Sequence, residues 1–320
     1  MTTTKLTDAG KQALAELVSL TEADNKLPGF AIAVTNTDEQ LFASAGGNKV
    51  FGNPTSGKVT PESMFWICSL TKLITSIAAL QLVEQGKLSV DDPVSKYIPQ
   101  FNKVVVLEGD YMSKETRPYP GRPAKEAITV ARLLNHSSGL AYFTRNPEVA
   151  HSNPACSSIK HGPTREATSE RFIQLLQEEY PGVPVFFEPG TAFTYGFNTD
   201  ILGVVIEKVV GKSLEEYCKE TIFKPVGMKT TTFRLTEESN QKLVGMTFRN
   251  ADGSVSPWAD HTRLMLVTLK KGFGWAGLCY LIDPATGIAI VVGSQVIPTM
   301  DAGAVALFNK VEDIVYANLG

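Results

Sequence analysis

Hydrophobic positions recur with two different periods along the chain, and these periods predict its secondary structure. Near the start, apolar residues at helical spacing predict an amphipathic helix over 13–21. Two short apolar segments, 29–34 and 41–45, follow on either side of a polar turn and predict a β-hairpin. Strand-like runs return late in the chain before a last helix, and the elements predicted there cover 242–249, 278–282, 288–293 and 304–318.

The middle of the chain has mainly helical signals separated by long loops. The helices predicted there cover 69–85, 128–134, 168–179 and 198–210. Gly86 and Gly211 are expected to end two of them, because glycine favours the left-handed conformation of a helix C-cap. We therefore expect an α+β fold, with one antiparallel sheet built from both chain ends and flanked by helices, and an inserted mainly helical domain. The predicted boundaries are 1–66 and 240–320 for the sheet domain and 67–239 for the helical domain.

Composition and charge exclude several classes of partner. The 320 residues are 43% hydrophobic and 20% charged, which is ordinary for a soluble globular protein. The net charge of -3 and the lack of a dense Lys/Arg cluster predict no nucleic-acid partner and no anionic membrane partner. The first residues contain no apolar signal-peptide core, and no apolar run approaches the length of a membrane span. We expect a cytoplasmic protein.

Cysteine and histidine usage predicts neither disulfides nor a bound metal. The four cysteines form no C-x-x-C pair and are expected to be free thiols, with Cys68 a small apolar side chain rather than a nucleophile. The four histidines show no metal-binding spacing. His151, Cys156 and His161 lie close together in sequence, but we do not expect them to bind a metal ion. The stretch 211–213 lacks the upstream glycine of a phosphate-binding loop. We expect no cofactor.

Ser69 and Lys72 form an S-x-x-K pair at the start of a strongly apolar helix. Residues three apart share a helix face, so the lysine amine can reach the serine hydroxyl. Burial among apolar neighbours would favour the neutral amine that a base requires, and the residues expected to supply it are Ile67, Leu70, Leu73, Ile74 and Ile77. Two further S-x-x-K matches begin at Ser157 and Ser239, but they lie in loop-like or polar stretches. A helix-start serine with an outward-pointing lysine is the structural alternative.

Two further motifs follow in order: Leu-Leu-Asn-His-Ser-Ser-Gly-Leu at 133–140 and Phe-Thr-Tyr-Gly-Phe-Asn-Thr-Asp at 193–200. With these, the chain resembles the serine β-lactamase and penicillin-binding-protein superfamily. Within it, the chain is most similar to the family VIII carboxylesterases and the fungal lovastatin-type side-chain acyltransferases. The resemblance implies that Ser69 forms an acyl-enzyme, that Lys72 takes its proton, and that Tyr195 is the partner base. It also implies an active site at the domain junction and a loop-organising role for His136.

The resemblance further implies an oxyanion strand whose backbone N–H joins that of Ser69. Two registers are open. A Trp-x-Gly match uses Trp275 and Gly277 and makes Leu278 the donor, whereas an ungapped match makes Gly274 the glycine and Trp275 the donor. Trp275 belongs to the site in both registers. Asn198, in the tyrosine motif, is counted with the substrate-binding residues.

The chain also departs from the superfamily pattern in two places. The lysine of the Lys-Thr-Gly motif is absent, which favours esters over β-lactams or peptides. The segment 255–271, before the oxyanion strand, is shorter than in relatives. We expect a carboxylesterase that cleaves short acyl esters or thioesters of small molecules, with its oligomeric state open. The alternatives are an acyltransferase of secondary metabolism, a β-lactamase or D,D-peptidase, and a catalytically silent binding protein.

Overall fold

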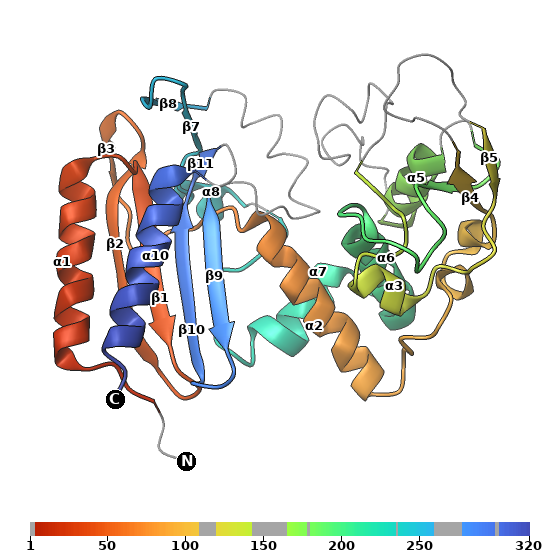
Figure 1. Ribbon diagram of the computed structural model, residues 1–320, viewed down its shortest axis with the longest axis horizontal. Coiled ribbons are helices and arrows are strands. Elements are labelled where there is room, and N and C mark those ends of the chain that lie inside the picture. The colour runs from red at the N-terminus through yellow and green to blue at the C-terminus, as the bar shows by residue number, and fades with distance from the viewer. Residues whose placement is uncertain are drawn as a thin grey trace. The chain divides into compact units, whose positions relative to one another are not determined.

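A computed structural model describes residues 4–108, 120–142, 165–177, 180–234, 236–258, 277–297 and 301–320. The described residues fall into two compact units (Figure 1). The sheet unit lies within Met1–Leu70, Arg234–Thr262 and Gly272–Gly320. The described part of the helical unit lies within Thr71–Phe233. Each unit has its own hydrophobic core.

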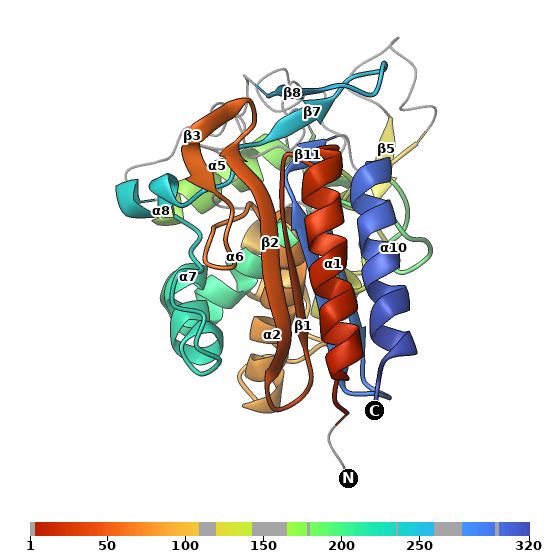
Figure 2. The ribbon, with the colours of Figure 1, turned by 90° about the vertical axis from the view of Figure 1, so that its left-hand side faces the viewer.

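The sheet unit is built on a five-stranded antiparallel sheet with the order β3-β2-β1-β10-β9. Strands from the two ends of the chain meet at its centre, where β1 pairs with β10. The helices α1 (Asp8–Asp24) and α10 (Ala302–Ala317) lie side by side on one face (Figures 1 and 2). The strands are β1 (Gly29–Thr35), β2 (Gln40–Val50), β3 (Asn53–Lys58), β9 (Leu278–Asp283) and β10 (Ile288–Ser294).

Buried and less buried side chains alternate along the central strands, and the buried ones mark the sheet face that the helices cover. Phe30, Ile32 and Val34 of β1 are fully buried, whereas the residues after each of them are only half-buried, because successive strand residues point to opposite faces. They pack with buried residues of β10, α1 and α10 in one cluster. Full burial of each such side chain contributes about 1.5–3 kcal/mol. The unit also contains α8 (Glu237–Gln241) and a small sheet of β7 (Thr247–Arg249), β8 (Val255–Pro257) and β11 (Val296–Ile297).

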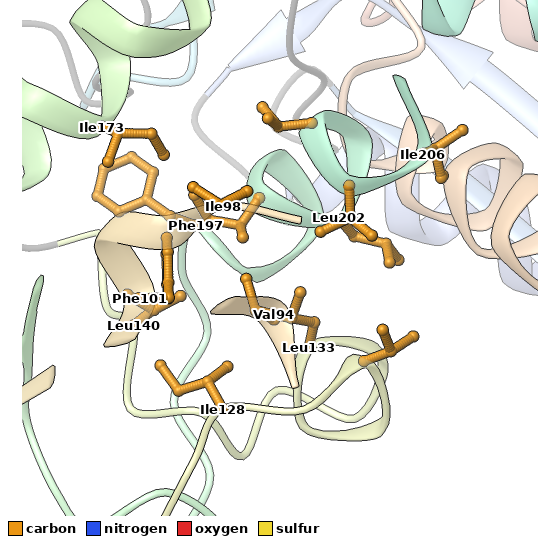
Figure 3. Packing of buried hydrophobic residues seen from close by; sticks show 14 of the residues in the cluster. Val94, Ile98, Phe101, Ile128, Leu133, Leu140, Ile173, Phe197, Leu202 and Ile206 are labelled. Carbon is orange, nitrogen blue, oxygen red and sulfur yellow. The ribbon is translucent and has the colours of Figure 1, made fainter. Parts of the chain in front are cut away.

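The helical unit is packed around α6 (Asn198–Val210), which is buried along most of its length. Figure 3 shows Phe197, Leu202 and Ile206 among the apolar side chains of this core. A three-stranded sheet, with the order β5-β4-β6, borders the helices. The other elements are α2 (Thr71–Glu84), η2 (Val94–Lys96), η3 (Pro99–Asn102), β4 (Val104–Leu107), β5 (Gly121–Pro123), α3 (Val130–Leu134), α5 (Arg165–Gln177), β6 (Val183–Val185), α7 (Leu214–Cys218) and η4 (Lys219–Phe223).

Most predicted elements are present, and the predicted antiparallel sheet from both chain ends, flanked by helices, is confirmed. The prediction for α6 is confirmed at both ends, with Gly211 in the left-handed conformation. The strand predicted over 242–249 is wrong in its first half, where only Leu243 makes an isolated bridge, and β7 starts at Thr247. The reason is local, because Thr236 caps the short helix α8 and the chain emerges from that helix at Lys242.

Candidate active site

Ser69 lies in a 3-10 turn, η1 (Cys68–Leu70), that leads directly into α2. The serine therefore precedes the helix on which we expected it, and Lys72 is the second residue of α2. Cys68 has a φ of 49°, a left-handed conformation that is uncommon for a residue other than glycine. The backbone just before Ser69 turns sharply.

Gln295 anchors the segment that leads to Ser69. Its side chain, 1% exposed, accepts a hydrogen bond from the Trp66 N–H (3.0 Å) and donates one to the Trp66 carbonyl oxygen (3.3 Å). Gln295 immediately follows β10, so these bonds fasten the approach to Ser69 to the end of a central strand. The sequence analysis missed this residue, because a single glutamine after an apolar strand carries no local signal.

The start of β9 presents a backbone N–H group at the edge of the sheet. Gly277 has a φ of 69°, and its carbonyl oxygen accepts hydrogen bonds from the N–H (3.2 Å) and hydroxyl (2.9 Å) of Ser294. The next pair along the ladder is Leu278 and Gly293. Hydrogen-bonded and non-hydrogen-bonded pairs alternate in an antiparallel ladder, so this pair, which follows the bonded pair of Gly277 and Ser294, is not hydrogen-bonded. The Leu278 N–H therefore points away from β10, on the outermost strand of the described sheet. Gly274 and Trp275 lie outside the described residues.

Lys72 lies against two tyrosine rings in the helical unit. Its Nζ is 4.7 Å from the centroid of the Tyr195 ring and 5.6 Å from that of Tyr142, within the range of cation–π attraction. Of the five apolar residues expected to bury this lysine, three are half-buried (Ile67, Leu70 and Ile74) and two, Leu73 and Ile77, are exposed. The two exposed residues point away from the buried face of α2, which carries Ala78 and Leu82. Aromatic rings from distant parts of the sequence surround Lys72.

His136 stacks on Tyr195. The two ring centroids are 5.1 Å apart with an interplanar angle of 19°, and Phe193 approaches the imidazole at 5.8 Å. Burial and the positive charge of Lys72 lower the pKa of His136, while the Thr194 backbone has a weaker, opposite effect. The imidazole is therefore neutral near pH 7. His136 was predicted to organise a loop, and it follows α3 with a φ of 59°.

Gly196 permits a close approach beside Tyr195. A Cβ placed there would overlap the Leu140 carbonyl oxygen and lie 2.6 Å from the Ala141 Cα. Asn198, which we counted with the substrate-binding residues, is fully buried as the first residue of α6. A buried amide at this place is suited to holding its neighbours in position. The sequence analysis did not single out Gly196, although its position directly after the motif tyrosine could have indicated it.

Other reactive groups in the described residues are less suited to chemistry. Burial raises the pKa of the Cys218 thiol to about 12 and also raises that of Cys279. Ser239, from a second S-x-x-K match, caps α8 with Thr236, and Lys242 pairs with Glu238. No group of three or more His, Cys, Asp or Glu side chains in the described part of the chain could hold a metal ion. Ser157, Cys156, His151 and His161 lie outside that part.

No helix in the described ranges combines the length and the apolar character needed to cross a bilayer.

Comparison with known proteins identifies the family. The family model described as Beta-lactamase matches residues 12–269. The chain belongs to the beta-lactamase family. Among curated members, it is 35% identical to the lovastatin esterase of Penicillium rubens over 213 residues, which cover 65% of this chain and 49% of that protein. It is 30% identical to the acyltransferase calJ of Penicillium decumbens over 222 residues, covering 65% of this chain and 47% of the relative.

The chain therefore spans about half the length of these curated relatives. A solved structure, the unliganded selenomethionyl simvastatin synthase LovD of Aspergillus terreus, superposes with a TM-score of 0.74. The match covers 96% of this chain and 98% of the other, at 18% identity. At that identity the likeness shows the fold alone. The predicted superfamily and its fold are confirmed.

Proposed function

We propose that this chain is a serine acyl-transfer enzyme that hydrolyses carboxylic esters of small molecules through an acyl-Ser69 intermediate. The observation that carries the proposal is the contact between Lys72 and the Tyr195 ring. Lys72 follows Ser69 by three residues, about one helical turn. A serine hydroxyl is a weak nucleophile unless a group that takes its proton is close by. Lysine and tyrosine side chains held together can supply that group, because each can donate and accept a proton in turn.

In the proposed reaction, the Ser69 Oγ attacks the ester carbonyl and its proton passes to the Lys72–Tyr195 pair. The C–O bond to the alcohol then breaks, and the leaving oxygen takes up a proton from the pair. In the second half, water attacks the acyl-Ser69 carbonyl and its proton passes to the pair. The bond between the acyl carbon and the Ser69 Oγ then breaks and Oγ takes the proton back, which releases the acid and regenerates the serine. The charge of Lys72 would stabilise negative charge that develops on the Tyr195 oxygen during these transfers.

The oxyanion donors we propose are the backbone N–H groups of Ser69 and Leu278. The outward direction of the Leu278 N–H and the left-handed Gly277 support the register in which Trp275, Gly277 and Leu278 match Trp-x-Gly. Loss of one donor in such a site typically lowers the rate on the order of a hundredfold or more. Trp275 remains a proposed wall of the substrate site.

Hydrolysis of p-nitrophenyl acetate and butyrate tests the proposal. We expect turnover in the wild type, and a reduction on the order of a thousandfold or more in Ser69→Ala, Lys72→Ala and Tyr195→Phe. Lys242→Ala is the matched control, because Lys242 has the same S-x-x-K spacing but pairs with Glu238 on the surface. Unchanged turnover in Ser69→Ala would overturn the proposal.

Transfer to an alcohol is the second candidate, favoured by the similarity to the acyltransferase calJ. The chemistry at Ser69 is the same, and only the acceptor of the acyl group differs. An acyl thioester supplied with and without a small alcohol separates the two. A new ester formed faster than free acid identifies a transferase, whereas free acid alone identifies a hydrolase. Acylation by penicillin G or nitrocefin would instead identify a β-lactamase or D,D-peptidase.

A further inference from the structure

The side-chain amide of Asn198 is held in one orientation inside the helical unit. The Ser138 hydroxyl donates a hydrogen bond to its Oδ1, and its Nδ2 donates one to the Leu140 carbonyl oxygen at 3.2 Å. The Ser138 oxygen in turn accepts from the Leu140 N–H at 3.1 Å. The Thr194 carbonyl oxygen also lies 3.4 Å from Nδ2. Because carbonyl oxygens only accept, turning the amide over would bring Oδ1 against both of them, so the two carbonyl groups fix the orientation of the amide.

This orientation determines what the amide presents to His136. The Nδ2 atom of Asn198 lies 3.1 Å from the Nδ1 atom of His136. An amide nitrogen only donates, so the imidazole nitrogen opposite it has to accept, and a neutral imidazole then carries its proton on Nε2. The backbone reinforces the arrangement, because the Thr194 N–H donates to the His136 carbonyl oxygen at 3.0 Å. His136 is thus bonded to a residue on each side of Tyr195, to Thr194 before it and to Asn198 after it.

The imidazole oriented in this way lies face to face with Tyr195, at the distance and angle given above. We propose that Asn198 and His136 are positioning residues: Asn198 fixes His136 as the Nε2–H tautomer, and the His136 ring holds the Tyr195 ring in register with Lys72. The catalytic consequence rests on the function proposed above, but the orientation of His136 does not. A protonated His136 would lose the bond from Asn198 and place a second positive charge near Lys72.

Nitrogen-15 NMR of histidine-labelled protein tests the first half directly. The chain has four histidines, and His136→Phe identifies the His136 signals by their disappearance. We expect a neutral Nε2–H imidazole at pH 7 in the wild type, and a mixture of tautomers in Asn198→Ala. Ser137→Ala is the matched control, since its hydroxyl bonds only to Asn135 among the described residues. An Nδ1–H imidazole in the wild type, or an unchanged signal in Asn198→Ala, would overturn the assignment.

The same spectra test the contact with Tyr195. Replacing the aromatic ring in Tyr195→Leu removes its ring current, so the carbon-bound protons of His136 should shift by several tenths of a part per million. The change should be absent in Ser137→Ala. Unmoved His136 protons in Tyr195→Leu would contradict the stacking. Because neither spectrum depends on turnover, these results stand even if the chain cleaves no ester.

Kinetics separate positioning from a purely structural role. Turnover is counted per active site, titrated with a fluorophosphonate. We expect His136→Leu to lower kcat between about tenfold and a hundredfold with little change in KM, and His136→Phe to recover most of the loss because it keeps a flat ring. A purely structural role would reduce the titrated fraction and leave kcat per site unchanged. Equal kcat in both variants and the wild type would overturn the positioning role. Failure of the wild type to react would contradict the proposed function instead.

Discussion

The imidazole of His136 lies nearly parallel to the phenol ring of Tyr195, with centroids 5.1 Å apart and an interplanar angle of 19°. The Tyr195 ring is also 4.7 Å from the Lys72 Nζ, so one aromatic ring contacts both a lysine side chain and a half-buried imidazole. These contacts join α2, the loop after α3 and the segment before α6. The proposed proton-transfer pair and the imidazole beside it therefore come from three separate parts of the sequence.

His136 should make the free energy of unfolding depend on pH below neutrality. Its pKa in the folded chain is lower than the ordinary value of 6.5, so between the two values the unfolded chain binds more protons. The stabilisation is complete above pH 6.5 and is lost as the pH falls toward the folded pKa. Urea unfolding of the wild type and His136→Phe at pH 7.5 and 5.5 measures this. The loss on acidification should be smaller in the variant, and an equal loss would contradict the prediction.

Gly196→Ala should disrupt the turn next to Tyr195. A Cβ at this position overlaps the Leu140 carbonyl oxygen, and that backbone is fixed through Ser138 and Asn198. We expect a loss of about 3 kcal/mol in unfolding free energy, measured by denaturant titration, together with loss of ester turnover. Gly203→Ala is the control, because its Cβ would meet only the Leu214 Cδ2 at 3.4 Å, an ordinary contact. Tolerance of Gly196→Ala would show that this backbone can move.

Gln295→Met should loosen the approach to Ser69 while keeping the volume of the side chain. The Trp66 N–H and carbonyl groups would lose their partners, at a cost of about 2 kcal/mol. We also expect slower labelling of Ser69 by a fluorophosphonate, because the segment before the nucleophile would no longer be fixed to the end of β10. Labelling kinetics followed by mass spectrometry measure this. An unchanged labelling rate in folded protein would contradict a role of Gln295 in positioning Ser69.

Gly277→Ala tests the donor at the start of β9. A side chain there is strained by the left-handed conformation and would overlap the Ser294 hydroxyl, so the Leu278 N–H should be displaced. We expect kcat for p-nitrophenyl butyrate to fall on the order of a hundredfold. Gly287→Ala is matched to it, since Gly287 has a φ of 73° at the far end of the same hairpin. That control should lose about 1 kcal/mol of stability but keep its turnover.

Local signals in the sequence predicted local structure well. The helix α6 was predicted at both ends, because its apolar face and the glycine at 211 are properties of neighbouring residues. The capping box of Ser213 and Glu216 at the start of α7 is of the same local kind, because its two residues lie three apart. The sheet β5-β4-β6 was not predicted, since β4 pairs in parallel with β6 from a distant part of the chain. Pairings of this kind depend on the tertiary fold rather than on sequence period.

Motifs in the sequence select candidate site residues but say little about their surroundings. Ser69, Lys72 and Tyr195 were selected from motifs, and the structure brings Lys72 and Tyr195 into contact. The surroundings of Lys72 were predicted only in part, because Leu73 and Ile77 are exposed and the tyrosine rings beside the lysine come from distant parts of the sequence. The roles of Gln295 and Ser138 depend on partners far away in sequence, and no local pattern could have indicated them.

Intact-mass spectrometry after exposure to a fluorophosphonate tests the central claim, that Ser69 is an activated nucleophile, without knowledge of the natural substrate. We predict one adduct per chain in the wild type, mapped to Ser69 by peptide analysis, no adduct in Ser69→Ala, and an adduct in the control Lys242→Ala. Circular dichroism confirms that each sample is folded. A folded wild type without an adduct, or an adduct that persists in Ser69→Ala, would contradict the claim, and the first result would indicate a catalytically silent member of the family.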